Sequence, residues 1–149
     1  MEELTENELL LIQDLSRRLP YGVKCRVTRK SAMIGLVREI SSIRPDGMFS
    51  FNQTSELVSI KDAEIKPFLY PLSSIDGKTR KEIGDGLKEI SKSNPPYGKL
   101  NPSGSDKLLI TVTLQASWLI EYYVKNHIDY LGLIDRGLAI DATGLDYYV

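Results

Sequence analysis

The chain of 149 residues contains a single cysteine, Cys25, and a single histidine, His127. One cysteine excludes an intrachain disulfide and a zinc site built from a cysteine cluster. One histidine excludes a two-imidazole metal site, and a catalytic base at His127 would need a nucleophile or metal partner. Because Cys25 lies between Val23 and Val27 on the apolar side of an alternating segment, we expect it to be buried and inert.

Long apolar runs and a strong net charge are also missing. No run approaches the ~20 apolar residues that a membrane-spanning helix requires. The acidic start MEELTENELL lacks the features of a signal peptide, and the net charge is −1. We therefore expect a cytosolic protein without a membrane partner, folded as a single domain over residues 1–149.

Signatures of catalysis are absent as well. The glycines of 84–86 and 98–104 lack the spacing and the following Lys-Ser/Thr of a phosphate loop. The C-terminal acids are spread over a turn, a helix and a tail, where turn formation is the usual role of aspartate. We predict no catalytic residues, no metal or cofactor, no enzymatic activity and no small-molecule ligand. The acids in question are Asp129, Asp135, Asp141 and Asp146.

The first half of the chain predicts a helix followed by short strands. Thr5 and Glu8 have the spacing of a capping box, and Pro20 ends the apolar helical pattern, which predicts a helix over residues 5–18. After Tyr21 the period changes from 3.6 to 2. The predicted strands cover about 23–28, 32–43, 48–51, 57–60 and 64–68. Strands this short, joined by tight turns, indicate a small antiparallel SH3-like β-barrel within residues 1–72.

The second half, residues 73–149, is predicted to be helical. Asp76 can cap a helix with a narrow apolar stripe, and 93–106 is rich in proline, glycine and serine and is typical of a loop. Residues 107–114 alternate like a strand, but they also fit a helix that is apolar nearly all round. Because the run to His127 is long, we predict a helix there.

The aromatic C-terminal segment is expected to be a structural anchor that clasps the β-module. Large aromatic side chains bury the most area per residue. Gly132 and Gly137 indicate a turn, then one helical turn ended by a left-handed cap, then a short strand over 138–140 that returns to the barrel edge. His127 is expected to bond the last helix carbonyls. The predicted anchor residues are Trp118, Tyr122, Tyr123, His127, Tyr130, Gly132 and Gly137.

The distribution of basic residues favours binding of nucleic acid. Residues 17–44 carry eight basic residues against one acid, Glu39. Basic side chains on one strand face could contact phosphates, while an ordinary solvated strand face is the competing interpretation. The candidate contacts are Lys24, Arg26, Arg29, Lys30 and Arg38.

Three stretches resemble a family of small uncharacterised proteins of gut bacteria and of their phages and prophages. They are residues 19–25 (LPYGVKC), 65–74 (IKPFLYPLSS) and 127–139 (HIDYLGLIDRGLA). The chain departs from the family at Tyr122, where a tryptophan is frequent, and at Asn126, where a second histidine is frequent. The resemblance implies a phage or mobile-element setting and supplies no catalytic residues.

These observations predict an α+β protein with an N-terminal helix, a small barrel, and C-terminal helices with a short final strand. The expected function is that of a non-enzymatic phage or prophage accessory protein acting through a protein partner or through self-association. The alternative is a nucleic-acid-binding module that uses the basic strand face.

Overall fold

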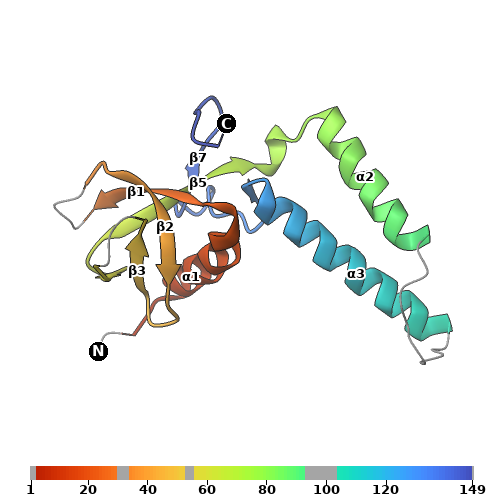
Figure 1. Cartoon of the computed structure of the whole chain (residues 1–149), viewed down its shortest axis with the longest axis horizontal. Coiled ribbons are helices and arrows are strands. Elements are labelled where there is room, and N and C mark those ends of the chain that lie inside the picture. The colour runs from red at the N-terminus through yellow and green to blue at the C-terminus, as the bar shows by residue number, and fades with distance from the viewer. Residues whose placement is uncertain (1–2, 30–33, 53–55, 93–103, 149) are drawn as a thin grey trace.

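The protein consists of a sheet-and-helix body from which two helices project as an arm (Figure 1). The computed structural model describes residues 3–29, 34–52, 56–92 and 104–148. The α+β class predicted from the sequence is confirmed. In chain order the elements are α1 (Glu6–Arg18), η1 (Leu19–Tyr21), β1 (Lys24–Arg29), β2 (Val37–Ile43), β3 (Met48–Phe51), β4 (Val58–Ser59), β5 (Glu64–Pro71), η2 (Leu72–Ser74), α2 (Gly77–Lys92), α3 (Gly104–Lys125), β6 (Ile128–Asp129) and β7 (Ile140–Asp141).

Helix α1 begins at the predicted capping box. The Thr5 hydroxyl accepts a bond from the Glu8 amide at 3.1 Å, and the Glu8 carboxylate accepts one from the Thr5 amide at 2.9 Å. This reciprocal arrangement satisfies two of the amides that a helix start leaves without partners. Pro20 lies in the 3-10 turn that follows, and Gly22, with φ of 75°, redirects the chain into β1.

The strands form one mixed sheet in the order β4-β3-β2-β1-β5-β6, and β7 also pairs with β5. The ladder from β4 to β5 is antiparallel. The two short C-terminal strands run parallel to β5, with β7 beside Phe68–Leu69 and β6 beside Tyr70–Pro71. The C-terminal segment therefore returns to the sheet as expected, although β7 covers 140–141 and not 138–140.

The sheet does not close into a barrel, so the prediction of an SH3-like barrel is corrected. Its terminal strands in this order, β4 and β6, are not paired with each other. Helix α1 covers the concave face instead, and Leu11, Ile12 and Leu15 are buried there. Because a helix already removes that face from water, the strands do not need to curl onto one another. The sheet and the turns next to its strands contribute Val23, Cys25, Val27, Ile40, Phe49, Phe51, Ile60, Ala63, Ile65 and Leu69 to this core.

The second strand is shorter than predicted. Gly35 has φ of 89°, and its amide bonds the Val27 carbonyl at 2.8 Å. A left-handed residue bonded in this way belongs to a turn. Strand β2 therefore begins at Val37 and not near Ala32, and residues 30–33 lie outside the described part of the chain.

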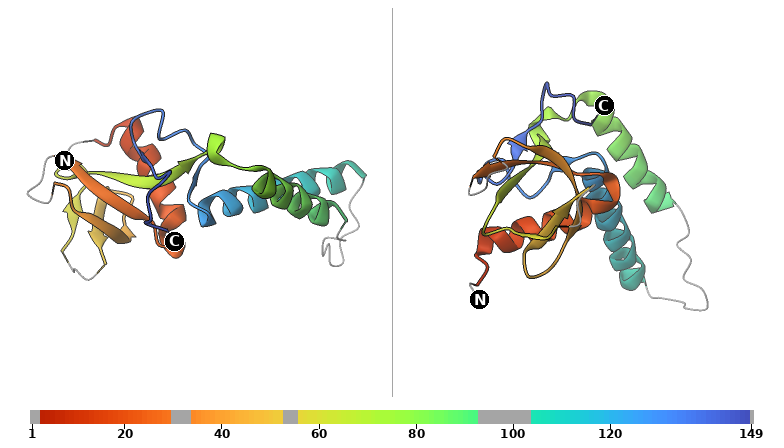
Figure 2. Two further views of the ribbon diagram at one scale, coloured as in Figure 1. Left: turned by 90° about the horizontal axis from the view of Figure 1, so that it is seen from above. Right: turned by 60° about the vertical axis from the view of Figure 1, so that its left-hand side comes forward.

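Helices α2 and α3 pack on each other and form the arm, which both views of Figure 2 show extending away from the sheet. The helix predicted over 107–114 is confirmed, since α3 begins at Gly104. Of the predicted loop, residues 93–103 lie outside the described segments and 104–106 belong to the first turn of α3. Where α3 ends, the chain returns to the body through His127, which has a left-handed φ of 59°.

The turn that leads to β7 follows the sequence pattern. Gly132 and Gly137 both have φ of 74°. The amide of Leu138 bonds the Leu133 carbonyl at 2.8 Å, and the Gly137 amide bonds the Ile134 carbonyl at 3.0 Å. These two bonds form the helix-ending motif that glycine favours.

Candidate functional site

A buried ion pair joins α1 to the C-terminal segment. Asp14 and Arg18 are both fully buried, and the carboxylate accepts a bond from the Arg18 Nε at 2.8 Å. Arg18 also donates to the Ile128 carbonyl at 2.7 Å. Burial raises the pKa of the Asp14 carboxyl, and the Arg18 guanidinium opposes that shift. This pair fixes the base of the arm, where the chain leaves the end of α3, against the body.

Asp129, which follows Ile128 in the chain, has a structural role of the kind predicted for the C-terminal acids. Its carboxylate is buried and accepts bonds from the amides of Leu133 and Ile134 at 2.8 and 2.9 Å. Two backbone donors satisfy both carboxylate oxygens. Asp129 therefore organises the turn that precedes β7.

His127 lies at this junction in a neutral form. Its ring stacks on the Tyr148 ring, with centroids 3.6 Å apart and planes inclined by 9°. Burial, together with the charges of Arg18 and Lys24, lowers the pKa of His127 to about 4. Its buried Nδ1 has no hydrogen-bond partner among the described residues, so the expected bond to the last helix carbonyls is replaced by stacking.

The predicted aromatic anchor divides between the arm and the body. Trp118 stacks on Tyr122, with ring centroids 5.4 Å apart, and the Tyr122 hydroxyl bonds Glu82 of α2 at 3.1 Å. Tyr123 instead stacks on Tyr130 at 6.0 Å, next to the sheet. One helix therefore carries aromatic contacts in two directions.

The predicted basic strand residues meet the C-terminal tail. Lys24 donates to the Tyr147 carbonyl at 2.7 Å, and Arg26 lies 3.5 Å from the Tyr147 hydroxyl. The Arg26 guanidinium also lies over the Phe68 ring, 5.3 Å from its centroid. Two of the five candidate contacts are thus engaged within the chain.

The other three candidates are distributed differently. Arg38 is exposed, and with Lys24 and Tyr147 it lines a cleft of about 410 Å³. The backbone of Arg29 lies opposite that of Glu64 in the β1–β5 ladder. Lys30 lies outside the described residues. Lys24 and Arg38 therefore line one cleft beside the tail, and Arg26 contacts the tail through Tyr147.

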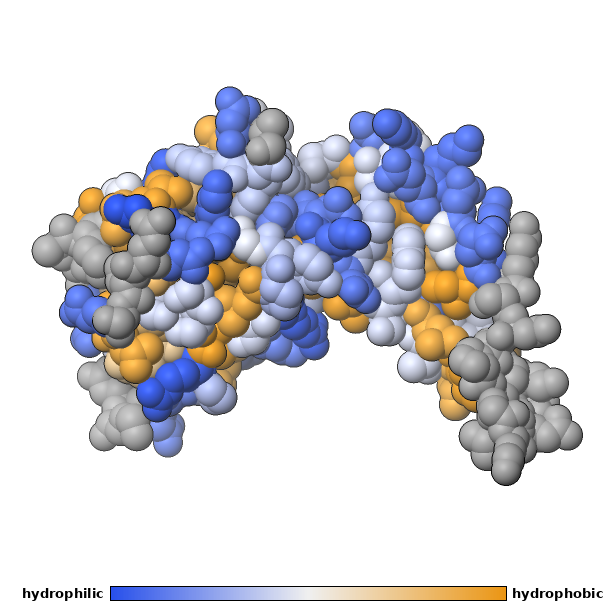
Figure 3. Space-filling view, viewed as in Figure 1, coloured by the Kyte–Doolittle hydropathy of each residue, from blue (hydrophilic) through white to orange (hydrophobic). Residues whose placement is uncertain are grey.

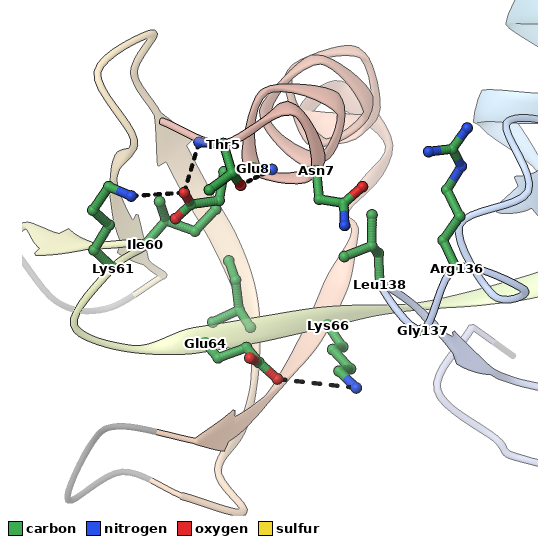
Figure 4. A pocket seen from close by; sticks show the side chains of 11 residues that line it. Thr5, Asn7, Glu8, Ile60, Lys61, Glu64, Lys66, Arg136, Gly137 and Leu138 are labelled. Atoms are coloured by element: carbon green, nitrogen blue, oxygen red, sulfur yellow. Dashed lines mark hydrogen bonds and ion pairs between the residues drawn. The ribbon is translucent and has the colours of Figure 1, made fainter. Parts of the chain in front are cut away.

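A larger cleft of about 450 Å³ lies between the start of α1, β5 and the turn before β7 (Figure 4). Glu8 and Lys61, which line it, form an ion pair at 2.7 Å. Figure 4 shows the Glu64 and Lys66 side chains on the side of β5 away from α1. The cleft brings together paired charges. Its lining residues are Thr5, Asn7, Glu8, Ile60, Lys61, Glu64, Ile65, Lys66, Arg136, Gly137 and Leu138.

Two features are absent from the described residues. No group of three or more His, Cys, Asp or Glu side chains there could hold a metal ion. None of the described helices combines the length and apolarity needed to cross a bilayer.

The most unusual surface lies on α3. We use the name α3 face for the exposed apolar residues Leu108, Leu109, Val112, Ala116 and Ile120. Their spacing places them along one side of the helix. Leu108 is 66% exposed, Leu109 67% and Val112 51%. Figure 3 shows hydrophobic residues along the arm, next to the hydrophilic surface of α2.

Helix α2 leaves this face open because it packs against a different side of α3. Gln115 donates to the Leu87 carbonyl at 3.1 Å, and Trp118 lies against Gly86. These contact positions are rotated from the α3 face by roughly a third of a turn. The sequence signal for the surface was the uncharged run from Leu108 to Ile120, from which we predicted a helix that is apolar nearly all round.

No family model, curated protein or solved structure matches this chain. The physical feature that distinguishes the molecule is a packed body joined to an arm whose apolar side is open to solvent.

Proposed function

We propose that this is a non-enzymatic binding protein whose α3 face docks against an apolar helix face of a protein partner. The observation that carries the proposal is the exposure of Leu108, Leu109 and Val112 on a helix that projects from the body. Three large apolar side chains at adjacent helical positions form a continuous patch, whereas isolated exposed leucines are common.

The energetics favour a helical partner. Burying one such side chain contributes about 1.5 to 3 kcal/mol, so a few of them together can support a weak to moderate complex. The α3 face offers side chains spaced by three and four residues, which is the pattern that an apolar helix face complements. A helix that is already folded loses little further conformational freedom on binding.

Site-directed photo-cross-linking in cells tests the proposal. We expect a benzoylphenylalanine residue at position 109 to give a defined cross-linked product, because Leu109 is the most exposed large apolar residue of the α3 face. The same residue in place of Lys81, an exposed position of α2, serves as the control. The product should disappear when Val112→Glu is added. Equal labelling from both positions, or a product insensitive to Val112→Glu, would contradict the proposal.

We propose a phage or prophage setting for this binding function. The motivation is that residues 19–25, 65–74 and 127–139 resemble stretches of a family of small phage and prophage proteins. The gene neighbourhood provides the test, because phage packaging, replication and lysis genes occur in groups. Neighbours with no phage or mobile-element genes would count against this setting.

Nucleic-acid binding is the second proposal, and the cleft lined by Lys24, Arg38 and Tyr147 is the observation that favours it. On such a surface a cation can bind a backbone phosphate and an aromatic ring can stack on a base. We expect Arg38→Glu to weaken DNA retention and to reduce its salt dependence, relative to the control Arg44→Glu. Unchanged binding in the Arg38→Glu variant would refute the proposal.

A further inference from the structure

We propose that the partner on the α3 face is a second copy of this chain, and that the two arms pair antiparallel as a four-helix bundle. This inference rests on the proposed function, because it names the occupant of the same surface.

The charge pattern of the surface suits pairing with itself. In a two-fold dimer each patch meets an identical patch, so a surface with charges of one sign would repel its copy. Between Lys107 and Glu121 the sequence of α3 contains no charged residue. Most charged residues of the arm belong to α2, and those of α3 lie before Leu108 or after Ile120 in the sequence. The α3 face can therefore meet its copy without bringing like charges together.

The size of the patch fits a weak dimer. The segment from Leu108 to Ile120 is about 20 Å long at 1.5 Å per residue, and a helix with its side chains is about 10 Å across. Two α3 faces of this size would bury roughly several hundred Å² in total between two copies. This area is below the about 1,200 Å² at which standard specific interfaces begin, so we expect a weak dimer that dissociates on dilution.

The position of the body selects the antiparallel arrangement. The apolar side of α3 stays exposed toward the tip, but at the other end Val124 is buried and Tyr123 stacks on Tyr130. In a parallel pair both bodies would crowd at the same end. In an antiparallel pair each body lies beside the tip of the partner's arm, and the helix dipoles also oppose one another.

The antiparallel arrangement fixes which residues meet. For a two-fold axis near the middle of the α3 face, Leu109 of one copy lies opposite Ile120 of the other. Within one chain these positions are about 17 Å apart along the helix, too far for a disulfide. A disulfide between positions 109 and 120 can therefore form only between copies.

The first measurement is mass by light scattering over about 1 to 200 µM. We expect a rise from one to two chain masses, and we expect Leu109→Glu to keep the protein monomeric over the whole range. Leu9→Glu is the matched control, because Leu9 is also an exposed leucine, 51% accessible, on a helix of the body. That variant should dimerise like the natural chain. Far-ultraviolet circular dichroism establishes that both variants remain folded.

The second measurement is disulfide formation under mild oxidation. We expect the double variant Leu109→Cys/Ile120→Cys to form a covalent dimer at least tenfold more efficiently than either single variant. The natural Cys25 is fully buried and can be retained. A strictly monomeric mass would overturn the inference, as would efficient cross-linking of Leu109→Cys to itself. Photo-cross-linking from position 109 to a different protein, with a monomeric mass, would leave the proposed function standing and remove this inference alone.

Discussion

At the scale of single residues, His127 shows how tertiary contacts change the chemistry of a side chain. Histidine normally titrates near neutral pH. Here burial and the neighbouring cations Arg18 and Lys24 favour the uncharged imidazole, whose ring stacks on Tyr148. The residue therefore packs in its uncharged form where α3 meets the body.

This environment predicts a pH dependence of stability. The pKa of His127 falls from 6.5 in the unfolded chain to about 4 in the folded one. Between these values the unfolded chain binds a proton that the folded chain excludes. The stabilising contribution is therefore complete above pH 6.5 and is lost as the pH falls toward 4. The full shift would correspond to about 3 kcal/mol, and because the ring is partly exposed to solvent we expect a loss on the order of 2 kcal/mol.

Urea unfolding at a series of pH values measures this loss. The comparison is with His127→Asn, because asparagine does not titrate and tolerates the left-handed backbone at this position. We expect the free energy of unfolding of the variant to vary less between pH 6.5 and pH 4. Parallel curves for the two proteins would show that His127 is not the group responsible.

At the scale of elements, the arm depends on close contact between α2 and α3. A Cβ atom added at Gly86 would lie 2.3 Å from ring atoms of Trp118. Glycine at this position is therefore required by packing, and it allows the indole to lie against the helix backbone. Gly84 lies one half-turn away, and a Cβ there would meet no atom within 4 Å.

These two glycines of α2 predict opposite effects for the same substitution. Gly86→Ala should destabilise the arm by about 1 to 3 kcal/mol, because the indole must move. Gly84→Ala should stabilise α2 by up to about 1 kcal/mol, because alanine favours the helix. Thermal unfolding followed by circular dichroism at 222 nm compares the two. A stabilising effect of Gly86→Ala would mean that the indole does not pack there.

At the scale of the whole molecule, the body and the arm differ in how they are held together. The body has a continuous core formed by α1 and the sheet. The arm is supported by the contact between its two helices and by its base near β6. Elements with fewer buried contacts open at lower free energy.

Hydrogen exchange should reveal this difference. At low protein concentration we expect amides near the tip of the arm, in α2 and in residues 108–117 of α3, to exchange faster than those of β1 and β5. If two arms pair, a higher protein concentration should slow exchange in α3 and leave β1 unchanged. Equal protection of arm and body at low concentration would contradict this description.

Local interactions account for what could be predicted from the sequence. The capping box of Thr5 and Glu8, the alternation around Cys25, and the glycine cap at Gly137 all act over a few neighbouring residues. Such interactions are encoded in short stretches, so the helices and most strands lie where the sequence predicted them. The buried state of Cys25 follows from the same local alternation.

Contacts between distant segments account for the rest. The sequence contains the apolar strand face, but the tertiary structure decides that α1 covers it and that the sheet remains open. The sequence likewise contains the basic residues Lys24 and Arg26, but folding brings the tail over them. The sequence alone also determined that α3 is apolar on most sides. Only the tertiary structure decided that α2 covers one of those sides and leaves the α3 face in solvent, because burial depends on which elements meet in space.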